Sequence, residues 1–469
     1  MTSIWSDTAA LPHFPQLKKD LSVDVLIIGG GMAGVLCTWK LCQAGVRCAL
    51  LEAEEIGSGI TKNTTAKLTS QHGLIYHQIQ KRYGREKARL YLDANEKALE
   101  EFRRLCGKDG IPCDFEEKAA YIYDRQDTRI LEQELDVLET IGFSASLSRA
   151  LPLPFPVAGA VCFPHQAQFH PLKFMTAIAE GLPIYEHSKV TQLAPGLAKT
   201  KEAAIHADQI IVATHFPFLN KHGSYFLKQY QHRSYVIALS PDSQEHSFNV
   251  NGMYADQDKK GLSFRNYGSQ LLIGGGSHRT GKKGGNWAQL EQFASSAYPS
   301  ASILAQWAAQ DCMTLDGIPY IGPYSRSTKK LYVASGFNKW GMTSSMAAAS
   351  LLTDLVLGRE NPYEALFSPS RTMLHPQLLL NGLEATKNIL TPARPRCPHL
   401  GCALKWNPAE HSWDCPCHGS RFARDGRLID NPASGDLKKP PAEKSPEPYD
   451  KPNSCTFSGT LQKRKLPGR

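Results

Sequence analysis

The residues best suited to metal chemistry lie late in the chain, in two short motifs. Cys397 and His399 form one pair, Cys415 and His418 form the other, and fifteen residues lie between His399 and Cys415. Thiolates and imidazoles are side chains that bind iron or zinc, so this pattern predicts a metal site. An ordinary zinc finger groups its cysteines before its histidines, whereas each motif here combines one of each. Each motif also contains one further cysteine.

These motifs resemble the signature of the Rieske [2Fe-2S] family. In that family two cysteines hold one iron and two histidines hold the other, which implies a ligand set of Cys397, His399, Cys415 and His418. The resemblance also implies a disulfide between the spare cysteines, Cys402 and Cys417. It continues through Gly419-Ser420-Arg421-Phe422, Asp425-Gly426 and Pro432-Ala433. The alternative is a structural zinc knuckle, but the six ordered site residues and the flanking glycines favour iron–sulfur.

A glycine-rich turn between a predicted strand and a predicted helix indicates a dinucleotide site. Gly29, Gly31 and Gly34 form the pattern G-x-G-x-x-G, after an apolar strand over residues 23–28 and before a helical stretch over residues 35–44. Gly29 allows the tight turn, Gly31 lets the backbone approach a pyrophosphate, and Gly34 lets helix and strand pack closely. The alternative is a glycine-rich turn in some other α/β unit.

The next elements strengthen the dinucleotide prediction. A second strand over residues 47–51 ends at Glu52, which lies 21 residues beyond Gly31. The Glu52 carboxylate can accept hydrogen bonds from ribose hydroxyls. The helix N-terminus, including Met32 and Ala33, is expected to bind the phosphates. This fingerprint fits NAD and FAD equally well.

The loop at residues 57–69 favours FAD. It is small and rich in hydroxyl groups, and it resembles the loop that holds the FAD phosphates and flavin ring in D-amino-acid-oxidase-like flavoproteins. The resemblance implies cofactor contacts from Ser58, Thr64, Thr65 and Ala66. An ordinary Ser/Thr-capped helix start is the alternative.

Later segments resemble the same superfamily. Strands predicted within residues 181–190 and 207–214 imply cofactor contacts from Val190, Ala213 and Thr214, although they also fit plain sheet. Residues 314–343 closely resemble the C-terminal flavin segment of the glycine- and sarcosine-oxidase-like branch, which implies contacts from Gly336, Asn338, Gly341, Met342 and Thr343. A helix N-terminus there would stabilise the negative charge of reduced flavin. The sequence shows no clear covalent flavin anchor, and His72 and Cys37 are kept as candidates for one.

The predicted fold is α/β. It consists of an FAD-binding Rossmann-like domain of the glutathione-reductase type, an inserted antiparallel-sheet substrate domain and a small C-terminal all-β Rieske-like domain. Residues 1–365 form the oxidoreductase, with FAD-binding parts at about 20–80, 150–220 and 310–360 and substrate parts at about 84–145 and 225–305. A linker at 366–392, the Rieske domain at 393–440 and a basic, Pro-rich tail at 441–469 follow.

The base of the Rieske domain is short. The family places several strands before its first cluster loop, whereas residues 376–388 here favour helix or linker. Asn431 also stands where the family usually has glycine before Pro432. We therefore expect the cluster loops to depend on the flavin domain for support.

Composition limits the classes of protein. The 469 residues are 42% apolar and 21% charged, which is typical of a globular chain of two or three domains. No apolar run reaches eighteen residues and the N-terminus lacks an apolar signal region, so we expect a cytoplasmic protein without a transmembrane segment. The net charge of +9 is mild, and no basic face carries interleaved aromatic residues, so nucleic acid is not an expected partner.

Both modules together predict an electron relay. The expected reaction is oxidation of a small amine or amino acid to an imine, with electrons passing from FAD through the cluster to an external one-electron carrier. Arg265, His278 and Lys339 are the candidate catalytic residues, since Arg in particular suits a substrate carboxylate. The alternatives are a reverse relay, an oxidase that uses O2 beside a structural cluster, and a non-enzymatic redox sensor. Substrate, carrier and oligomeric state are left open.

An absorbance spectrum with metal analysis of the purified chain checks both cofactor predictions. We expect flavin bands together with two irons per chain, because a Rieske cluster contains two iron atoms. Zinc instead of iron would contradict the Rieske prediction, and a spectrum without flavin bands would contradict the FAD prediction.

Overall fold

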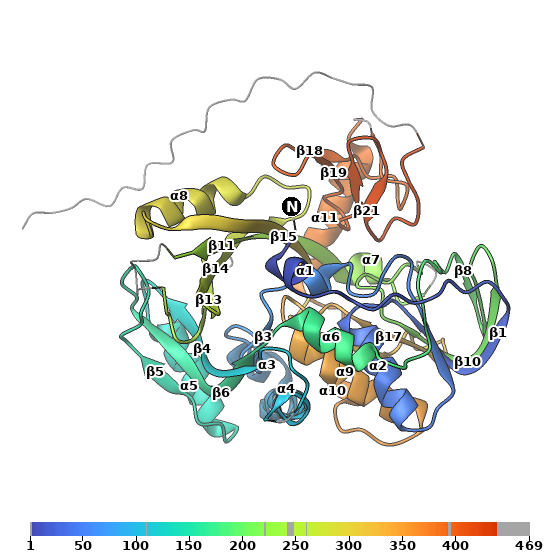
Figure 1. Cartoon of the computed structure of the whole chain (residues 1–469), viewed down its shortest axis with the longest axis horizontal. Coiled ribbons are helices and arrows are strands. Elements are labelled where there is room, and N and C mark those ends of the chain that lie inside the picture. Colours follow the sequence, from blue (N-terminus) through green and yellow to red (C-terminus); the bar gives the residue numbers. More distant parts are fainter. Residues whose placement is uncertain are drawn as a thin grey trace, which may run out of the picture.

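The computed structural model describes residues 2–108, 110–219, 222–241, 248–258, 260–392 and 395–438 (Figure 1). The predicted tail at 441–469 lies outside these residues. Three sheets organise the described chain. Among its helices, none combines the length and the apolar character needed to cross a lipid bilayer.

The first sheet has eight strands and is mainly parallel. Its main path runs β16-β17-β10-β1-β2-β7, and β8 (Gln192–Ala194) and β9 (Leu197–Lys199) extend it from β10. Residues 25–28 are buried without interruption, as expected for a strand covered on both faces. Helices α2 (Met32–Gln43) and α9 (Gly341–Val356) pack against each other beside this sheet. The path strands are β1 (Leu21–Ile28), β2 (Cys48–Leu51), β7 (Ile184–Tyr185), β10 (Ala204–Val212), β16 (Tyr320–Pro323) and β17 (Leu331–Ser335).

The second sheet has nine strands and is antiparallel except for the β12–β4 pair. It is larger than the inserted layer expected at residues 225–305, because strands from both sides of that segment join it. Its order is β15 (Ser302–Thr314), β11 (Gln229–Ser240), β14 (Gln270–Arg279), β13 (Ser263–Tyr267), β12 (Met253–Asp256), β4 (Glu116–Asp124), β6 (Gly159–Gln168) and β3 (Lys67–Leu68), with β5 (Ser146–Ser148) beside β6.

Helices pack around these two sheets. The two amphipathic stretches expected at residues 84–106 and 127–140 form α4 (Arg85–Cys106) and α5 (Arg129–Thr140). Their buried positions recur at helical spacing, so each helix covers apolar surface with one face. The other helices of the two larger units are α1 (Ile4–Thr8), α3 (Tyr76–Tyr83), α6 (Pro171–Ala179), α7 (Tyr225–Lys228), α8 (Trp287–Ala297) and α10 (Glu364–Phe367).

The third sheet is a small antiparallel unit of four strands. It contains β18 (Lys405–Asn407), β19 (Ser412–Asp414), β20 (Arg421–Ala423) and β21 (Leu428–Asp430). Helix α11 (Pro376–Leu390) occupies the place of additional base strands, and Ala385 packs against the core of this unit. The three sheets together confirm the predicted α/β fold with a small C-terminal β unit.

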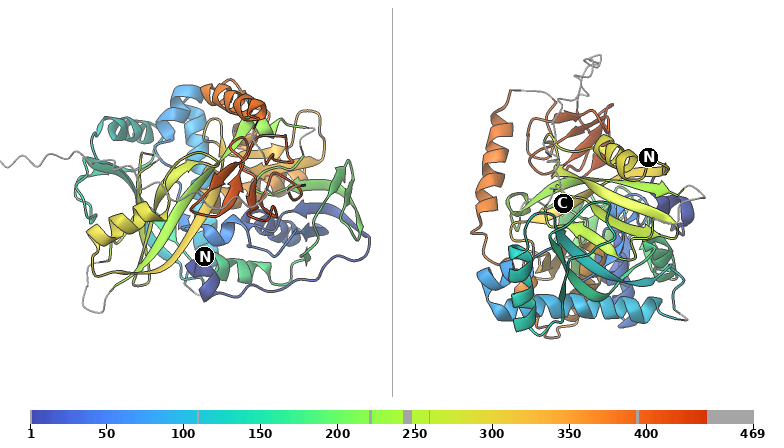
Figure 2. Two further views of the ribbon diagram at one scale, coloured as in Figure 1. Left: turned by 90° about the horizontal axis from the view of Figure 1, so that it is seen from above. Right: turned by 90° about the vertical axis from the view of Figure 1, so that its left-hand side faces the viewer.

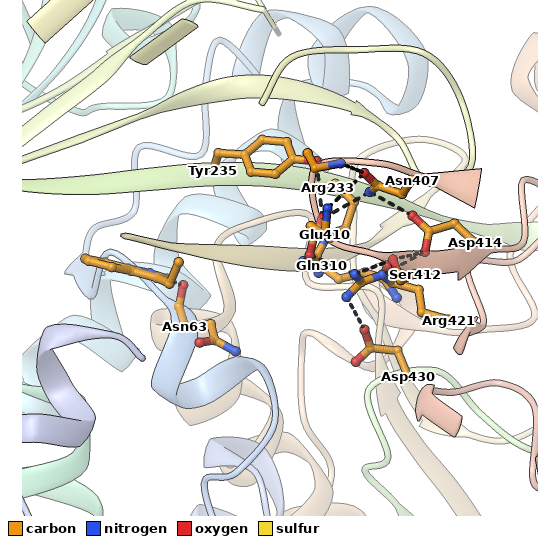
Figure 3. A network of polar contacts seen from close by, with 12 residues as sticks. Asn63, Arg233, Tyr235, Gln310, Asn407, Glu410, Ser412, Asp414, Arg421 and Asp430 are labelled. Atoms are coloured by element: carbon orange, nitrogen blue, oxygen red, sulfur yellow. Dashed lines mark hydrogen bonds and ion pairs between the residues drawn. The ribbon is translucent and has the colours of Figure 1, made fainter. Parts of the chain in front are cut away.

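A buried group of charges fastens the small sheet to the second sheet (Figure 3). Arg233 of β11 forms an ion pair with Glu410, and their side chains are only 5% and 8% exposed. Glu410 also accepts a hydrogen bond from Arg421 at 2.7 Å. Arg421 in turn contacts Asp414 at 3.1 Å and Asp430 at 3.0 Å. We call the third sheet and its loops the cluster unit. The network supports the hypothesis that this unit depends on the rest of the chain. Figure 2 shows that unit, in red, against the green and yellow strands.

Glu410→Gln should lower the free energy of unfolding by about 3 kcal/mol at pH 7, because two buried arginines lose a charged partner. Urea unfolding of the full chain measures this change. Glu86→Gln is the matched control, since Glu86 pairs with Arg89 at 3.8 Å in an exposed position; we expect an effect below about 1 kcal/mol there. Equal effects of the two substitutions would contradict a special role for the buried pair.

The same variant should change the response to acid. Burial alone would raise the pKa of Glu410, but Arg233 and Arg421 hold it below its ordinary value of 4.5. The stabilisation by the carboxylate is therefore complete above about pH 4.5 and is lost as the pH falls through the folded-state pKa. We expect Glu410→Gln to lose less stability than the parent chain over this acid range.

Candidate functional site

The glycine turn after β1 has the geometry that its sequence predicts. Gly29 has a φ of +112°, and a Cβ there would lie 2.7 Å from the Ala213 carbonyl oxygen. A Cβ on Gly34 would lie 1.8 Å from the Gly29 oxygen, so close packing excludes any side chain. A Cβ on Gly31 meets only Thr61 Oγ1, at 3.6 Å. Space therefore remains beside Gly31 at the start of α2, as a pyrophosphate requires.

Glu52 follows β2 and closes the glycine turn. Its Oε2 accepts a hydrogen bond from the Gly30 amide at 2.5 Å, and its Oε1 accepts one from the Glu54 amide at 2.9 Å. Burial raises the pKa of Glu52, while these amide bonds oppose that effect. Thr61 was not among the predicted residues, yet its hydroxyl accepts a bond from the Met32 amide at 3.1 Å.

The hydroxyl-rich loop is braced by distant side chains. It forms the short 3-10 helix η1 (Ile60–Asn63) and then turns at Ala66, which has a φ of +53°. Trp307 Nε1 donates to the Asn63 oxygen at 3.0 Å. Trp5 Nε1 donates to the Thr64 oxygen at 2.7 Å. These indole contacts fix the backbone beside the predicted residues Ser58, Thr64 and Thr65.

Arg265 completes this brace. It is 1% exposed, and its Nη1 donates to the oxygens of Thr65 and Ala66, both at 2.8 Å. Its guanidinium also lies 5.4 Å from the centre of the Trp5 ring. Burial lowers the pKa of Arg265 to about 9. These contacts differ from the predicted grip on a substrate carboxylate, because the guanidinium is directed at main-chain oxygens of the loop.

The other two catalytic candidates, Lys339 in the turn before α9 and His278 on β14, both lie beside Ser277. Lys339 Nζ donates to Ser234 Oγ at 3.0 Å and to Ser277 Oγ at 2.6 Å. His278 follows Ser277 and shares a hydrogen bond of 3.2 Å with Tyr235 OH. Burial lowers the pKa of His278, which favours the neutral ring. This arrangement can orient a polar group, and it assigns no general base.

The C-terminal flavin segment begins α9 as expected. Asn338 donates to the Gly336 oxygen at 2.7 Å and accepts from the Thr314 amide at 2.8 Å, which shapes the turn before Gly341 and Met342. Thr343 Oγ1 donates to the Thr69 oxygen at 2.9 Å. The start of α9 is thereby joined to the hydroxyl-rich loop.

Both open candidates for a covalent flavin anchor are buried side chains. His72 hydrogen-bonds through Nδ1 to Tyr91 OH at 2.7 Å and through Nε2 to the Thr69 oxygen at 2.8 Å. Burial lowers the pKa of His72 to about 3. Cys37 is fully buried in α2, and burial raises its pKa to about 12.

The three remaining predicted contacts lie beside the first sheet. Val190 is buried in a cluster that includes Leu51 of β2. Ala213 follows β10, and its amide donates to the Ile28 oxygen at 2.8 Å. Thr214 comes next and accepts a bond of 2.7 Å from the Asn431 side chain.

The cluster loops bring the predicted metal ligands together. The rings of His399 and His418 lie 5.0 Å apart and are nearly perpendicular. The thiols of Cys397 and Cys415 hydrogen-bond to each other, and this contact lowers the pKa of Cys397 to about 7. Cys402 and Cys417 form the disulfide that the resemblance implied.

These donors fit a Rieske cluster. His418 is 3% exposed, and its Nδ1 is buried without a hydrogen-bond partner among the described residues. A buried nitrogen of this kind is costly unless it binds a further group. One pair of thiols and one pair of imidazoles match the two unlike irons of the cluster. Cys397, Cys415, His399 and His418 would hold it.

Comparisons with known proteins agree with both sites. Residues 24–355 match the family model described as FAD dependent oxidoreductase, and residues 374–441 match the model of the Rieske [2Fe-2S] domain. The chain is 34% identical to YhfW of Bacillus subtilis (strain 168), which is named as a Rieske 2Fe-2S iron-sulfur protein. That alignment covers 93% of this chain and 96% of the relative.

More distant relatives match the larger part alone. The gamma-glutamylputrescine oxidoreductase of Escherichia coli (strain K12) is 23% identical, over 76% of this chain and 89% of that protein. The crystal structure of glycine oxidase from Geobacillus kaustophilus aligns with a TM-score of 0.63 at 20% identity, over 75% of this chain and 100% of that one. At this identity the structural likeness shows the fold.

Gly31→Ala should weaken FAD binding at least tenfold, equivalent to about 1.4 kcal/mol, because its Cβ enters the space beside the first amides of α2. The fold should persist, since only Thr61 is near that Cβ. Titration of the apoprotein with FAD measures affinity, and far-ultraviolet circular dichroism measures folding. Gly34→Ala is the contrasting variant, and we expect it to yield little folded protein. Unchanged FAD affinity in Gly31→Ala would contradict the assigned phosphate position.

Proposed function

The chain belongs to the family of FAD dependent oxidoreductases and carries a Rieske [2Fe-2S] domain, and from this premise we propose that it oxidises a small amine or amino acid. The carbon beside nitrogen loses two electrons and two protons are released, which yields an imine. The electrons leave one at a time through the Rieske domain to an external one-electron carrier, so two carrier molecules are reduced in each turnover.

One observation carries this proposal: the cluster loops pack directly against strands of the oxidoreductase. Gln231 of β11 donates to the His418 oxygen at 3.0 Å, and Gln310 of β15 donates to the Gly419 oxygen at 2.9 Å. Both glutamines are buried. A distant or loosely attached cluster unit would not need such contacts, and an electron-transferring one benefits from them.

The names of two relatives support the amine class. One relative is named for gamma-glutamylputrescine and a structural neighbour for glycine. FAD supplies the chemistry, since it accepts two electrons as a hydride and can release them singly. The chain supplies position, because buried indole and guanidinium groups hold the backbone of the hydroxyl-rich loop. A neutral amine needs no dedicated base.

Anaerobic stopped-flow mixing with a panel of small amines and amino acids tests this function. We expect at least one member to bleach the flavin absorbance, followed by the absorbance change of a reduced cluster. Carrier-dependent turnover should exceed peroxide formation in air by tenfold or more.

Three other outcomes would replace the proposal. Bleaching by a reduced carrier but by no amine would favour the reverse relay. Full turnover with peroxide and no carrier would favour an oxidase with a structural cluster. A spectral response to oxidants without any turnover would favour a redox sensor.

A further inference from the structure

We propose that residues 213–216 form a fixed electron bridge between the FAD site and the cluster, with Phe216 as its contact to the metal ligands and Asn431 as its clamp. This inference rests on the part of the proposed function in which electrons cross between the two cofactors. It adds the route inside the chain and the residues that maintain it.

One end of the bridge lies against both FAD segments. Ala213 packs on the glycine turn, where its oxygen leaves no room for a Cβ on Gly29. The His215 oxygen accepts a bond of 2.5 Å from Ser335 Oγ, and Ser335 directly precedes the Gly336 turn of the C-terminal flavin segment. The bridge is therefore attached to both segments that are expected to hold the cofactor.

The other end lies against the cluster ligands. Phe216 is 0% exposed, and its ring centre lies 6.5 Å from that of His399 and 6.4 Å from that of His418. Both contacts are edge-on. One aromatic side chain from the FAD domain thus touches the imidazoles of both predicted iron ligands. Dense packing of this kind keeps atoms in contact along the path between the two sites.

Asn431 fastens the bridge to the cluster unit. Its side-chain amide donates to the Thr214 oxygen at 2.7 Å and to the Phe216 oxygen at 3.2 Å. Its own carbonyl accepts a bond of 3.1 Å from Gln231. The glycine usual at this place in Rieske proteins has no side chain and could make neither contact to the bridge. Asn431, which replaces that glycine, therefore has a physical role in holding the bridge.

Further contacts hold the cluster loops against the second sheet. Arg279 donates to the oxygens of Pro416 and Cys417, both at 3.0 Å. A Cβ on Gly419 would lie 2.6 Å from Gln231 Cβ, so the two backbones approach as closely as a glycine permits. With these bonds the cluster loops cannot separate from β11 without exposing several buried polar groups. Residues 213–216 therefore keep one fixed position relative to the cluster loops.

The step itself is a single electron transfer. One electron passes from the reduced flavin to the cluster, so that the charge of the cluster falls by one unit. No bond of the chain forms or breaks. The accompanying flavin proton passes to solvent. The second electron follows after the external carrier has reoxidised the cluster. The rate of this step depends on the separation and on the atoms between the two sites, which residues 213–216 determine.

Laser-flash photoreduction of the flavin in the holoenzyme, followed by cluster absorbance, measures this step without any amine. Phe216→Leu keeps an apolar side chain but removes the ring, and Asn431→Gly restores the family residue. We expect each to slow flavin-to-cluster transfer at least tenfold. FAD content, iron content and the electron paramagnetic resonance spectrum of the reduced cluster should stay those of the parent protein.

Phe226→Leu is the matched control. Phe226 also contacts His418, with ring centres 6.3 Å apart, but it lies on α7 instead of the bridge. Its transfer rate should stay within twofold of the parent. Equal rates in Phe216→Leu and the parent, or an equal loss in both phenylalanine variants, would overturn the inference. If one bridge variant loses iron, the other decides the question.

The two proposals fail separately. If no amine bleaches the flavin but flash reduction shows the expected pattern, the bridge stands and the substrate class falls. If the parent protein shows no flavin-to-cluster transfer after the flash, the bridge falls regardless of the substrate.

Discussion

The buried charges around Arg421 are the constraint on which the arrangement of both redox sites depends. Glu410 links Arg421 of the cluster unit to Arg233 of the second sheet, and each of the three side chains is almost completely buried. Buried charges of this kind are stable only when all partners are present. A four-stranded sheet with a short base is thereby held in one position, and that position places the cluster loops on β11 and β15.

Many polar side chains at the predicted FAD site hydrogen-bond to main-chain atoms of the protein. Arg265 binds two carbonyl oxygens of the hydroxyl-rich loop, and Asn338 binds the turn before α9. Trp5 comes from the extreme N-terminus and still donates to the same loop. This pattern fits a site whose chemistry is supplied by a cofactor, because the protein then has mainly to hold that cofactor in place.

The junction between the two modules is more than a covalent connection. Gln231, Gln310, Arg279 and Asn431 all donate to main-chain oxygens across it. Satisfied polar groups in a close-packed interface make its geometry specific. The fusion of a flavin domain and a cluster domain therefore provides a constant distance between two redox centres, which two freely diffusing proteins do not have.

Features that depend on a local sequence pattern could be predicted without the structure. Gly29 is required by its positive φ and Gly34 by its close approach to the Gly29 oxygen, both within one strand–turn–helix unit. The Cys–His motifs likewise carry their own spacing, so both sites could be predicted. The local pattern over residues 376–388 favoured helix or linker without deciding between them, and the structure has α11 there. The contacts of Arg265, Phe216 and Asn431 could not be predicted in this way. Their partners lie roughly two hundred positions away along the chain, and no local periodicity records such a contact, because it exists only once separate sheets have packed together.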